Sequence, residues 1–293
     1  TPALKKAIVD KFKRENNLDY LSEQISVGTG GKQIIFNAIL ATVNPGDEVI
    51  IPTPYWVSFA DITRYVGAKP VFVDTLEEDD FQLTAEIVEA AINSKTRLLI
   101  INSPSNPSGA VLDNDEFIKI ARLCQARNVI LMSDECYAYF LYDGREPFSI
   151  GSVPDLQDTV IIAGSLSKTY AMTGWRIGYA LGPQSLIKGI GKLQSHSTSN
   201  PTSIAQKAAV EALSGPQDSV AGMLKEYAER RRYVVDRLRA IHGIACAEPG
   251  GAFYAYPNVS ATLYTVIIIA FRLFLPLASK VKIISKESSS GSI

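Results

Sequence analysis

Cysteine is scarce in this sequence, and its few copies are far apart. The 293 residues contain three cysteines, Cys124, Cys136 and Cys246, and no two of them form a C-x-x-C pair. A disulfide framework needs paired cysteines, and a zinc or redox motif needs closely spaced ones. The pattern therefore excludes a disulfide-built fold, gives no metal site, and favours a reducing, cytoplasmic location.

An excess of charge of either sign is also missing. The chain carries 29 lysines and arginines against 30 aspartates and glutamates, for a net charge of −1. Nucleic-acid-binding proteins present an excess of basic residues, so we expect no nucleic-acid partner. The charged run at residues 229–232 contains three arginines, and the acids Glu226, Glu229 and Asp236 interleave with them, which is typical of a solvated or interface-lining helix face.

Apolar runs of the length that crosses a membrane are missing too. Such a helix needs about 20 apolar residues, whereas the apolar stretch at residues 263–278 is shorter and contains Arg272 and Pro276. We expect no membrane partner, and interpret this stretch as buried or as foreign to the preceding fold. The chain opens at Thr1 with neither a methionine nor a signal peptide. We expect that it begins inside a longer protein.

Short apolar runs alternate with helical patterns through most of the chain. The strand candidates are residues 48–51, 70–73, 98–102, 129–133, 159–163 and 177–181, and the helix candidates are residues 32–43, 55–66, 84–92 and 115–127. This alternation predicts an α/β fold with a mainly parallel sheet. Ligands bind at the carboxyl ends of such strands, so we expect chemistry after Asn102, Ser133 and Ala163.

A long helix is predicted over residues 217–241, ending near Gly243. We place a domain boundary at this point. Residues 1–242 then form a large ligand-binding domain that includes the long helix. Residues 243–293 form a smaller C-terminal part that becomes atypical after about residue 260.

The most specific segment runs from Ser165 to Tyr179 with the sequence SLSKTYAMTGWRIGY. It places Lys168 directly after an apolar strand and Arg176 eight residues later. A lysine amine forms a Schiff base with an aldehyde, and an arginine fork with the hydroxyls of Ser165 and Ser167 suits a phosphate. One cofactor offers both groups, so the segment predicts pyridoxal 5′-phosphate (PLP).

Four further segments fit the same cofactor. They are VGTGGKQ, PYWVS, NSPSNPSG and SDECY, at residues 27–33, 54–58, 102–109 and 133–137. The glycines precede a helix whose free N–H groups attract an anion, and the amide of Asn106 both donates and accepts hydrogen bonds. The carboxylate of Asp134 would keep a pyridine nitrogen protonated. Taken singly, each segment is also compatible with a turn, a helix cap or a core residue.

In combination, these motifs resemble the class I/II aminotransferases of the type I PLP-dependent fold, and are most similar to their bacterial aspartate aminotransferase branch. The resemblance runs from Thr1 to about Ser260. It implies a seven-stranded, mainly parallel central sheet flanked by helices, an incomplete small C-terminal domain, and a homodimer. The implied reaction moves an amino group between an amino acid, aspartate or glutamate, and a 2-oxo acid.

The resemblance also implies a role for each motif residue. Lys168 anchors PLP and carries a proton, while Asp134 keeps the ring nitrogen protonated. Tyr137 and Asn106 bind the phenolic oxygen, and Trp56 stacks on the ring. The phosphate is assigned to Gly30, Gly31, the Lys32 backbone, Ser165, Ser167 and Arg176. The substrate is assigned to Trp56, Asn106 and the side chain of Lys32, which favours a dicarboxylic amino acid.

Two parts of the family pattern have no counterpart in this sequence. One is an N-terminal arm with a tyrosine that reaches the partner's phosphate. The other is an arginine in an R-(L/I)-S-Y-A context, expected after the GAFY motif at residues 251–254, that clamps the substrate α-carboxylate; Arg272 does not match it. We expect a truncated or frame-disrupted product that binds PLP but turns over poorly.

Other functions remain open on the residues alone. One is an aminotransferase for an aromatic amino acid, alanine or prephenate. Another is a PLP-binding chain that is catalytically impaired. A PLP-domain transcription regulator would need a helix-turn-helix and a basic face, and the sequence provides neither.

Overall fold

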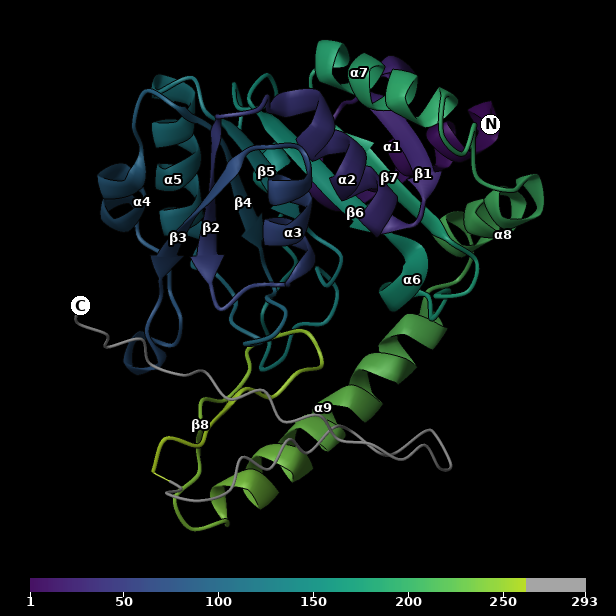
Figure 1. Cartoon of the computed structure of the whole chain (residues 1–293). Coiled ribbons are helices and arrows are strands. Elements are labelled where there is room, and N and C mark those ends of the chain that lie inside the picture. Colours follow the sequence, from purple (N-terminus) through teal and green to yellow (C-terminus); the bar gives the residue numbers. More distant parts are fainter. Residues whose placement is uncertain (262–293) are drawn as a thin grey trace.

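The computed structural model describes residues 1–261 and shows a central sheet between helices, with one long helix extending away from it (Figure 1). The sheet has seven strands in the order β1-β7-β6-β5-β4-β2-β3. Their bounds are β1 (Ile25–Thr29), β2 (Glu48–Thr53), β3 (Lys69–Asp74), β4 (Thr96–Asn102), β5 (Ile130–Asp134), β6 (Val160–Ser165) and β7 (Ile177–Leu181). Five strands pair in parallel, and β7 runs antiparallel to both of its neighbours, β1 and β6. This confirms the predicted seven-stranded, mainly parallel sheet.

Helices cover both faces of the sheet. On one face lie α2 (Gly31–Thr42), α3 (Ser58–Tyr65) and α7 (Gln184–Ser195), and on the other lie α1 (Pro2–Asn16), α4 (Ala85–Ala91), α5 (Asn114–Ala126) and α8 (Ser203–Ser214). Leu98 and Ile100 of β4 pack against the helices of the first face, and Leu99 and Ile101 pack against the helices of the other face. A strand buried on both faces is a continuous apolar run, which is why the sequence pattern detected β4.

Short helical turns connect several of these elements. They are the 3-10 turns η1 (Ser22–Gln24), η2 (Glu77–Asp79) and η3 (Ile150–Ser152), and the four-residue helix α6 (Leu166–Thr169).

The structure differs from the sequence expectations at several points, and helices α7 and α8 were not predicted. Helix α3 begins at Ser58, not at residue 55, so residues 55–57 form a loop after Pro54. Helix α9 (Asp218–Arg239) ends before Gly243, with Ala240 as its C-cap, and Gly243 lies in the turn that follows. Strand β1 was not predicted, because a serine and a glycine interrupt its apolar pattern.

Helix α9 leads away from the sheet, and the chain then folds back (Figure 1). The two-residue strands β8 (Ala245–Cys246) and β9 (Pro257–Asn258) pair with each other, and an isolated bridge joins Gly251 to Leu141. The apolar stretch 263–278, with Arg272, lies outside the described residues, as does most of the predicted C-terminal part. No helix within residues 1–261 is both long and apolar enough to cross a membrane.

Candidate active site

One cavity of about 260 Å³ lies at the carboxyl ends of β4, β5 and β6. Its lining consists of Gly31, Lys32, Ile35, Trp56, Asn102, Asn106, Asp134, Cys136, Tyr137, Ser165, Ser167, Lys168, Thr173, Arg176 and Tyr254. Every residue predicted for the site is among them except Gly30, which instead lies against Arg176. The segments are far apart in the sequence, and the parallel sheet brings their ends to one edge.

The end of β4 holds the loop that carries Asn106. The Asn102 side chain accepts a hydrogen bond from the Asn106 backbone N–H at 2.7 Å and donates one to the Asp134 carbonyl at 3.1 Å. Asn102 thus ties the end of β4 to the end of β5. This role of Asn102 was not predicted from the sequence, although Asn102 opens the same NSPSNPSG motif.

Strand β5 ends at Asp134, whose carboxylate lines the cavity and has little contact with solvent. Asp134 is buried and accepts a hydrogen bond from the Cys136 backbone N–H at 3.1 Å. Burial disfavours the charged form and raises the Asp134 pKa to about 6, against the smaller opposing effect of the Cys136 hydrogen bonds. A cationic ligand atom beside this carboxylate would offset its burial.

Two tyrosines meet above the end of β5. The hydroxyls of Tyr137 and Tyr254 are 2.6 Å apart, and either can donate the hydrogen bond. Burial is the largest cause that raises the pKa of both phenols, so both are protonated at neutral pH. Tyr254 belongs to the GAFY motif, but sequence reasoning gave it no role, because its contact with Tyr137 spans more than a hundred residues.

The end of β6 turns directly into the short helix that carries Lys168. The Ser165 hydroxyl caps this helix by accepting the Ser167 backbone N–H at 3.1 Å, and it also contacts the Ser167 hydroxyl at 2.9 Å. The Lys168 amine lies 5.4 Å from the ring centroid of Phe253. The cap holds the two hydroxyls and the amine on one side of the turn, inside the cavity.

The glycine turn before α2 approaches Arg176 too closely for a side chain. A Cβ on Gly30 would lie 2.3 Å from Arg176 Nη2, and Gly30 has φ +84°. Gly178 is equally constrained, since its Cβ would lie 2.4 Å from the Gly31 backbone nitrogen. The Arg176 Nη1 donates to the Thr173 carbonyl at 2.8 Å. These glycines bring the N-terminus of α2, the guanidinium and the serine hydroxyls to one end of the cavity.

Lys32 and Trp56 also line the cavity and lie close together. The Lys32 amine is 4.9 Å from the Trp56 ring centroid, and Trp56 packs edge-on against Phe59 at 5.4 Å. Contact with the indole face attracts the ammonium group. Trp56 belongs to the loop at residues 55–57, which replaces the first turn of the predicted helix.

The described residues contain no group of three histidine, cysteine or acidic side chains that could hold a metal ion. All three cysteines are free, and Cys136 lines the cavity. Burial, with Asp134 close by, raises the Cys136 pKa, so this thiol is protonated at neutral pH.

Comparison with known proteins gives consistent matches over most of the chain. The sequence model of the family described as aminotransferase class I and II matches residues 1–285. The aspartate/prephenate aminotransferase of Cereibacter sphaeroides is 48% identical over 267 residues, covering 89% of this chain and 66% of that protein. The chain thus spans about two thirds of the length of this curated relative.

Solved structures agree with the fold. The crystal structure of an aspartate aminotransferase from Rhizobium meliloti has a TM-score of 0.87 at 46% identity, covering 90% of this chain and 66% of the other. An aromatic aminotransferase from Pyrococcus horikoshii has a TM-score of 0.85 at 38% identity, covering 88% and 69%. The type I PLP-dependent fold predicted from the motifs is confirmed. The family match also extends beyond residue 260, where the resemblance was expected to stop.

Proposed function

Because the chain belongs to the class I and II aminotransferases, we propose that it transfers an amino group between an amino acid and a 2-oxo acid with PLP as cofactor. This proposal is supported by the residues that line one cavity. They include Asn106, Asp134, Tyr137, Lys168 and Arg176. An amine, an anion-binding end and a buried carboxylate at one strand edge are the set that this cofactor requires.

The residues present fit PLP. Gly31 at the start of α2, the serine hydroxyls and Arg176 line one end of the cavity and would bind an anion, and a Cβ on Gly30 would overlap the Arg176 guanidinium. Asp134, whose burial the Cys136 hydrogen bonds offset only in part, would pair with the protonated ring nitrogen. Asn106 and Tyr137 would hold the phenolic oxygen, and Trp56 the ring face. When bound, the cofactor supplies an electron sink for charge that develops on the substrate α-carbon.

The protein's own residues then orient the cofactor and move the proton. The Lys168 amine would hold the cofactor at its carbonyl carbon and, when free, would take a proton from the substrate α-carbon. The Ser165 cap stabilises the turn that carries Lys168 and so fixes the point from which the amine enters the cavity. Asp134 would keep its charge beside a protonated ring nitrogen, because that pairing would offset its burial.

Replacing Gly30 by alanine is expected to weaken PLP binding about tenfold or more. The new Cβ would displace Arg176, and hydrogen bonds to charged groups contribute about 1.5–3 kcal/mol. Gly46→Ala is the matched control, because Gly46 has φ +90° but nothing within 4 Å of its Cβ position. Fluorescence titration with PLP separates the two: equal affinity losses would show that backbone strain, not Arg176, is responsible.

We assign Lys32 to the distal carboxylate of a dicarboxylic substrate, which makes aspartate and glutamate the donors. The Lys32→Ala variant is expected to lower kcat/KM for aspartate about 10–100-fold, the loss of one charge-assisted hydrogen bond. Turnover of alanine, which has no second carboxylate, should be unchanged. Equal effects on both amino acids would remove this assignment and favour the alternative of an aminotransferase for another amino acid.

We also propose a homodimer and the domain division at residue 242. We place the second copy of the chain at a groove of about 730 Å³ beside α2 and α7. Its lining includes the apolar side chains of Phe36, Leu40 and Leu193. The cytoplasmic location expected from the cysteines stays a prediction.

Two measurements on the wild-type chain test the function. Titration with PLP should produce a bound-cofactor absorbance that disappears in Lys168→Ala, and aspartate with 2-oxoglutarate should then give oxaloacetate. Absorbance without turnover would identify the catalytically impaired form expected from the unmatched arginine. Absence of both would refute the proposed function.

A further inference from the structure

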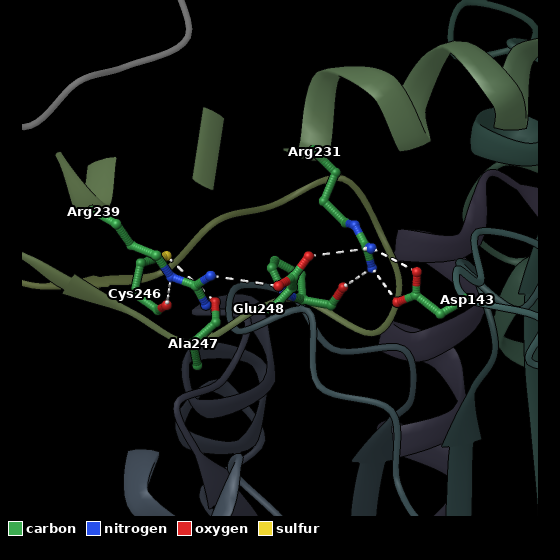
Figure 2. A network of polar contacts seen from close by, with 7 residues as sticks. Asp143, Arg231, Arg239, Cys246, Ala247 and Glu248 are labelled. Atoms are coloured by element: carbon green, nitrogen blue, oxygen red, sulfur yellow. Dashed lines mark hydrogen bonds and ion pairs between the residues drawn. The ribbon is translucent and has the colours of Figure 1, made fainter. Parts of the chain in front are cut away.

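Arg231 of α9 is a buried arginine outside the cavity. Its guanidinium makes a bidentate pair with Asp143 at 2.7 and 2.8 Å, donates to the Pro249 carbonyl at 2.8 Å and lies 3.3 Å from Glu248 (Figure 2). The side chain is 8% exposed, and its Cζ is 4.6 Å from the Tyr142 ring centroid. Arg231 therefore joins the long helix, the loop after β5 and the returning chain.

The chain that Arg231 holds continues into the wall of the cavity. Within residues 249–254, the Gly251 N–H donates to the Gly109 carbonyl at 2.9 Å, and the Ala252 N–H donates to the Phe140 carbonyl at 2.8 Å. Gly109 ends the loop that carries Asn106, and Phe140 follows Tyr137 by three residues. The segment is thus fixed to two of the strand-end loops that form the site.

The last two residues of this segment reach the reacting groups. The Tyr254 hydroxyl is 2.6 Å from that of Tyr137, and the Phe253 ring packs edge-on against Tyr137 at 5.2 Å. The same Phe253 ring lies 5.4 Å from the Lys168 amine. A shift of the backbone at residue 249 would therefore change the distance between the hydroxyls of Tyr137 and Tyr254.

We propose that Arg231 is a positioning residue that clamps residues 248–250 so that Tyr254 donates a hydrogen bond to Tyr137. The inference rests on the proposed function, in which Tyr137 donates to the cofactor's phenolic oxygen. Since a hydroxyl has one proton, the Tyr137 oxygen must then accept from Tyr254. Tyr254 makes Tyr137 a stronger donor, and Arg231 sets the distance between them.

The geometry requires arginine at this position. Its planar fork reaches Asp143 and the Pro249 carbonyl at once, whereas a lysine presents a single ammonium group. Asp143 and Glu248 have side chains 63% and 45% exposed, so water can solvate them when the arginine is replaced. The Arg231→Met variant therefore leaves no buried unpaired charge, and we expect it to fold.

The first test needs no cofactor. In Arg231→Met, amide hydrogen exchange over residues 249–254 should become about tenfold faster or more, because the segment opens locally. Arg231→Lys should not restore the slow exchange, and Asp143→Asn should show part of the effect. Arg127→Met is the control: Arg127 pairs with Glu89 at 2.6 Å at the end of α5, away from the cavity.

The second test reads the effect at the site. With PLP bound, the pH midpoint of the cofactor absorbance should rise by about half a unit in both Arg231→Met and Tyr254→Phe, because the phenolic oxygen loses stabilisation. Tyr254→Phe should leave hydrogen exchange unchanged, since it removes one oxygen atom.

The outcomes separate this proposal from the function on which it rests. A wild-type chain with no bound-cofactor absorbance would refute the proposed function, while the exchange test would still decide whether Arg231 holds the segment. Unchanged exchange in Arg231→Met, or an unchanged absorbance midpoint in either variant of a chain that binds PLP, would overturn the positioning role.

Discussion

Lys168→Ala is expected to abolish the bound-cofactor absorbance and to lower amino transfer by at least about 10³-fold. Lys168 lies on the turn that Ser165 caps, and it lines the cavity together with the hydroxyls of Ser165 and Ser167. In the proposed function this amine has two tasks, holding the cofactor carbon and carrying the proton, and general acid–base catalysis alone contributes about 10²–10⁴-fold. An alanine can do neither.

The variant should nevertheless fold, because Lys168 is only partly buried. Lys207→Ala, at an exposed position of α8, provides the control and should behave as wild type. Circular dichroism establishes the fold, and a PLP absorbance scan with an aspartate assay gives the result. A Lys168→Ala protein that retained the wild-type absorbance would show that another amine holds the cofactor.

Asp134→Asn is expected to stabilise the cofactor-free protein and to impair the reaction at the same time. Burial raises the Asp134 pKa from its ordinary 3.8 to about 6. Below pH 3.8, the carboxyl is protonated in both the folded and the unfolded chain, so it contributes no difference. As the pH rises to about 6, the unfolded chain loses the proton first, and the free energy of unfolding falls. Above pH 6 the free energy of unfolding falls no further, and the total decrease is about 3 kcal/mol.

An asparagine avoids that loss and can still accept the Cys136 N–H. Denaturant unfolding should therefore show Asp134→Asn more stable than wild type by up to about 3 kcal/mol at pH 7.5, and equal to it near pH 3.5. With PLP, the order should reverse, because the amide provides no charge for the ring nitrogen. Activity should fall by about 10²-fold or more.

Glu135→Gln is the matched control for this prediction. Glu135 is the next residue, and burial raises its pKa to about 7 although it accepts hydrogen bonds from Ser133 and Ser149. It does not line the cavity. Glu135→Gln should also raise stability above pH 7 but leave PLP binding unchanged. If both variants impaired PLP binding equally, the cause would be a disturbance of the end of β5 and not the loss of the Asp134 carboxylate.

Much of the site could be predicted from the sequence, because the chemistry-bearing residues follow buried strands directly. Asn106, Asp134 and Lys168 each come within a few residues of an apolar run, and parallel strands end at a common edge. Strand β1 could not be predicted in this way, since it depends on pairing with β7 more than on its own apolar pattern. The start of α3 at Ser58 was also missed, because Pro54 and the Trp56 loop together decide it.

Asn102 and Tyr254 were missed for a different reason. Each acts through a contact between segments that the chain separates widely, the first with the end of β5 and the second with Tyr137. Nothing in their local sequence distinguishes them from turn or core residues. The same is true of Arg231, which sequence reasoning placed on a solvated or interface-lining helix face and the structure shows buried against Asp143.

The sequence by itself determined the family, the sheet type and most of the residues that line the cavity, because motif spacing and apolar periodicity are properties of the local chain. Only the tertiary structure decided how closely Gly30 approaches Arg176, which hydroxyl Tyr137 meets and what Arg231 holds. Those contacts depend on how strands pair and on where the chain returns after α9. Both are set by packing across the whole molecule.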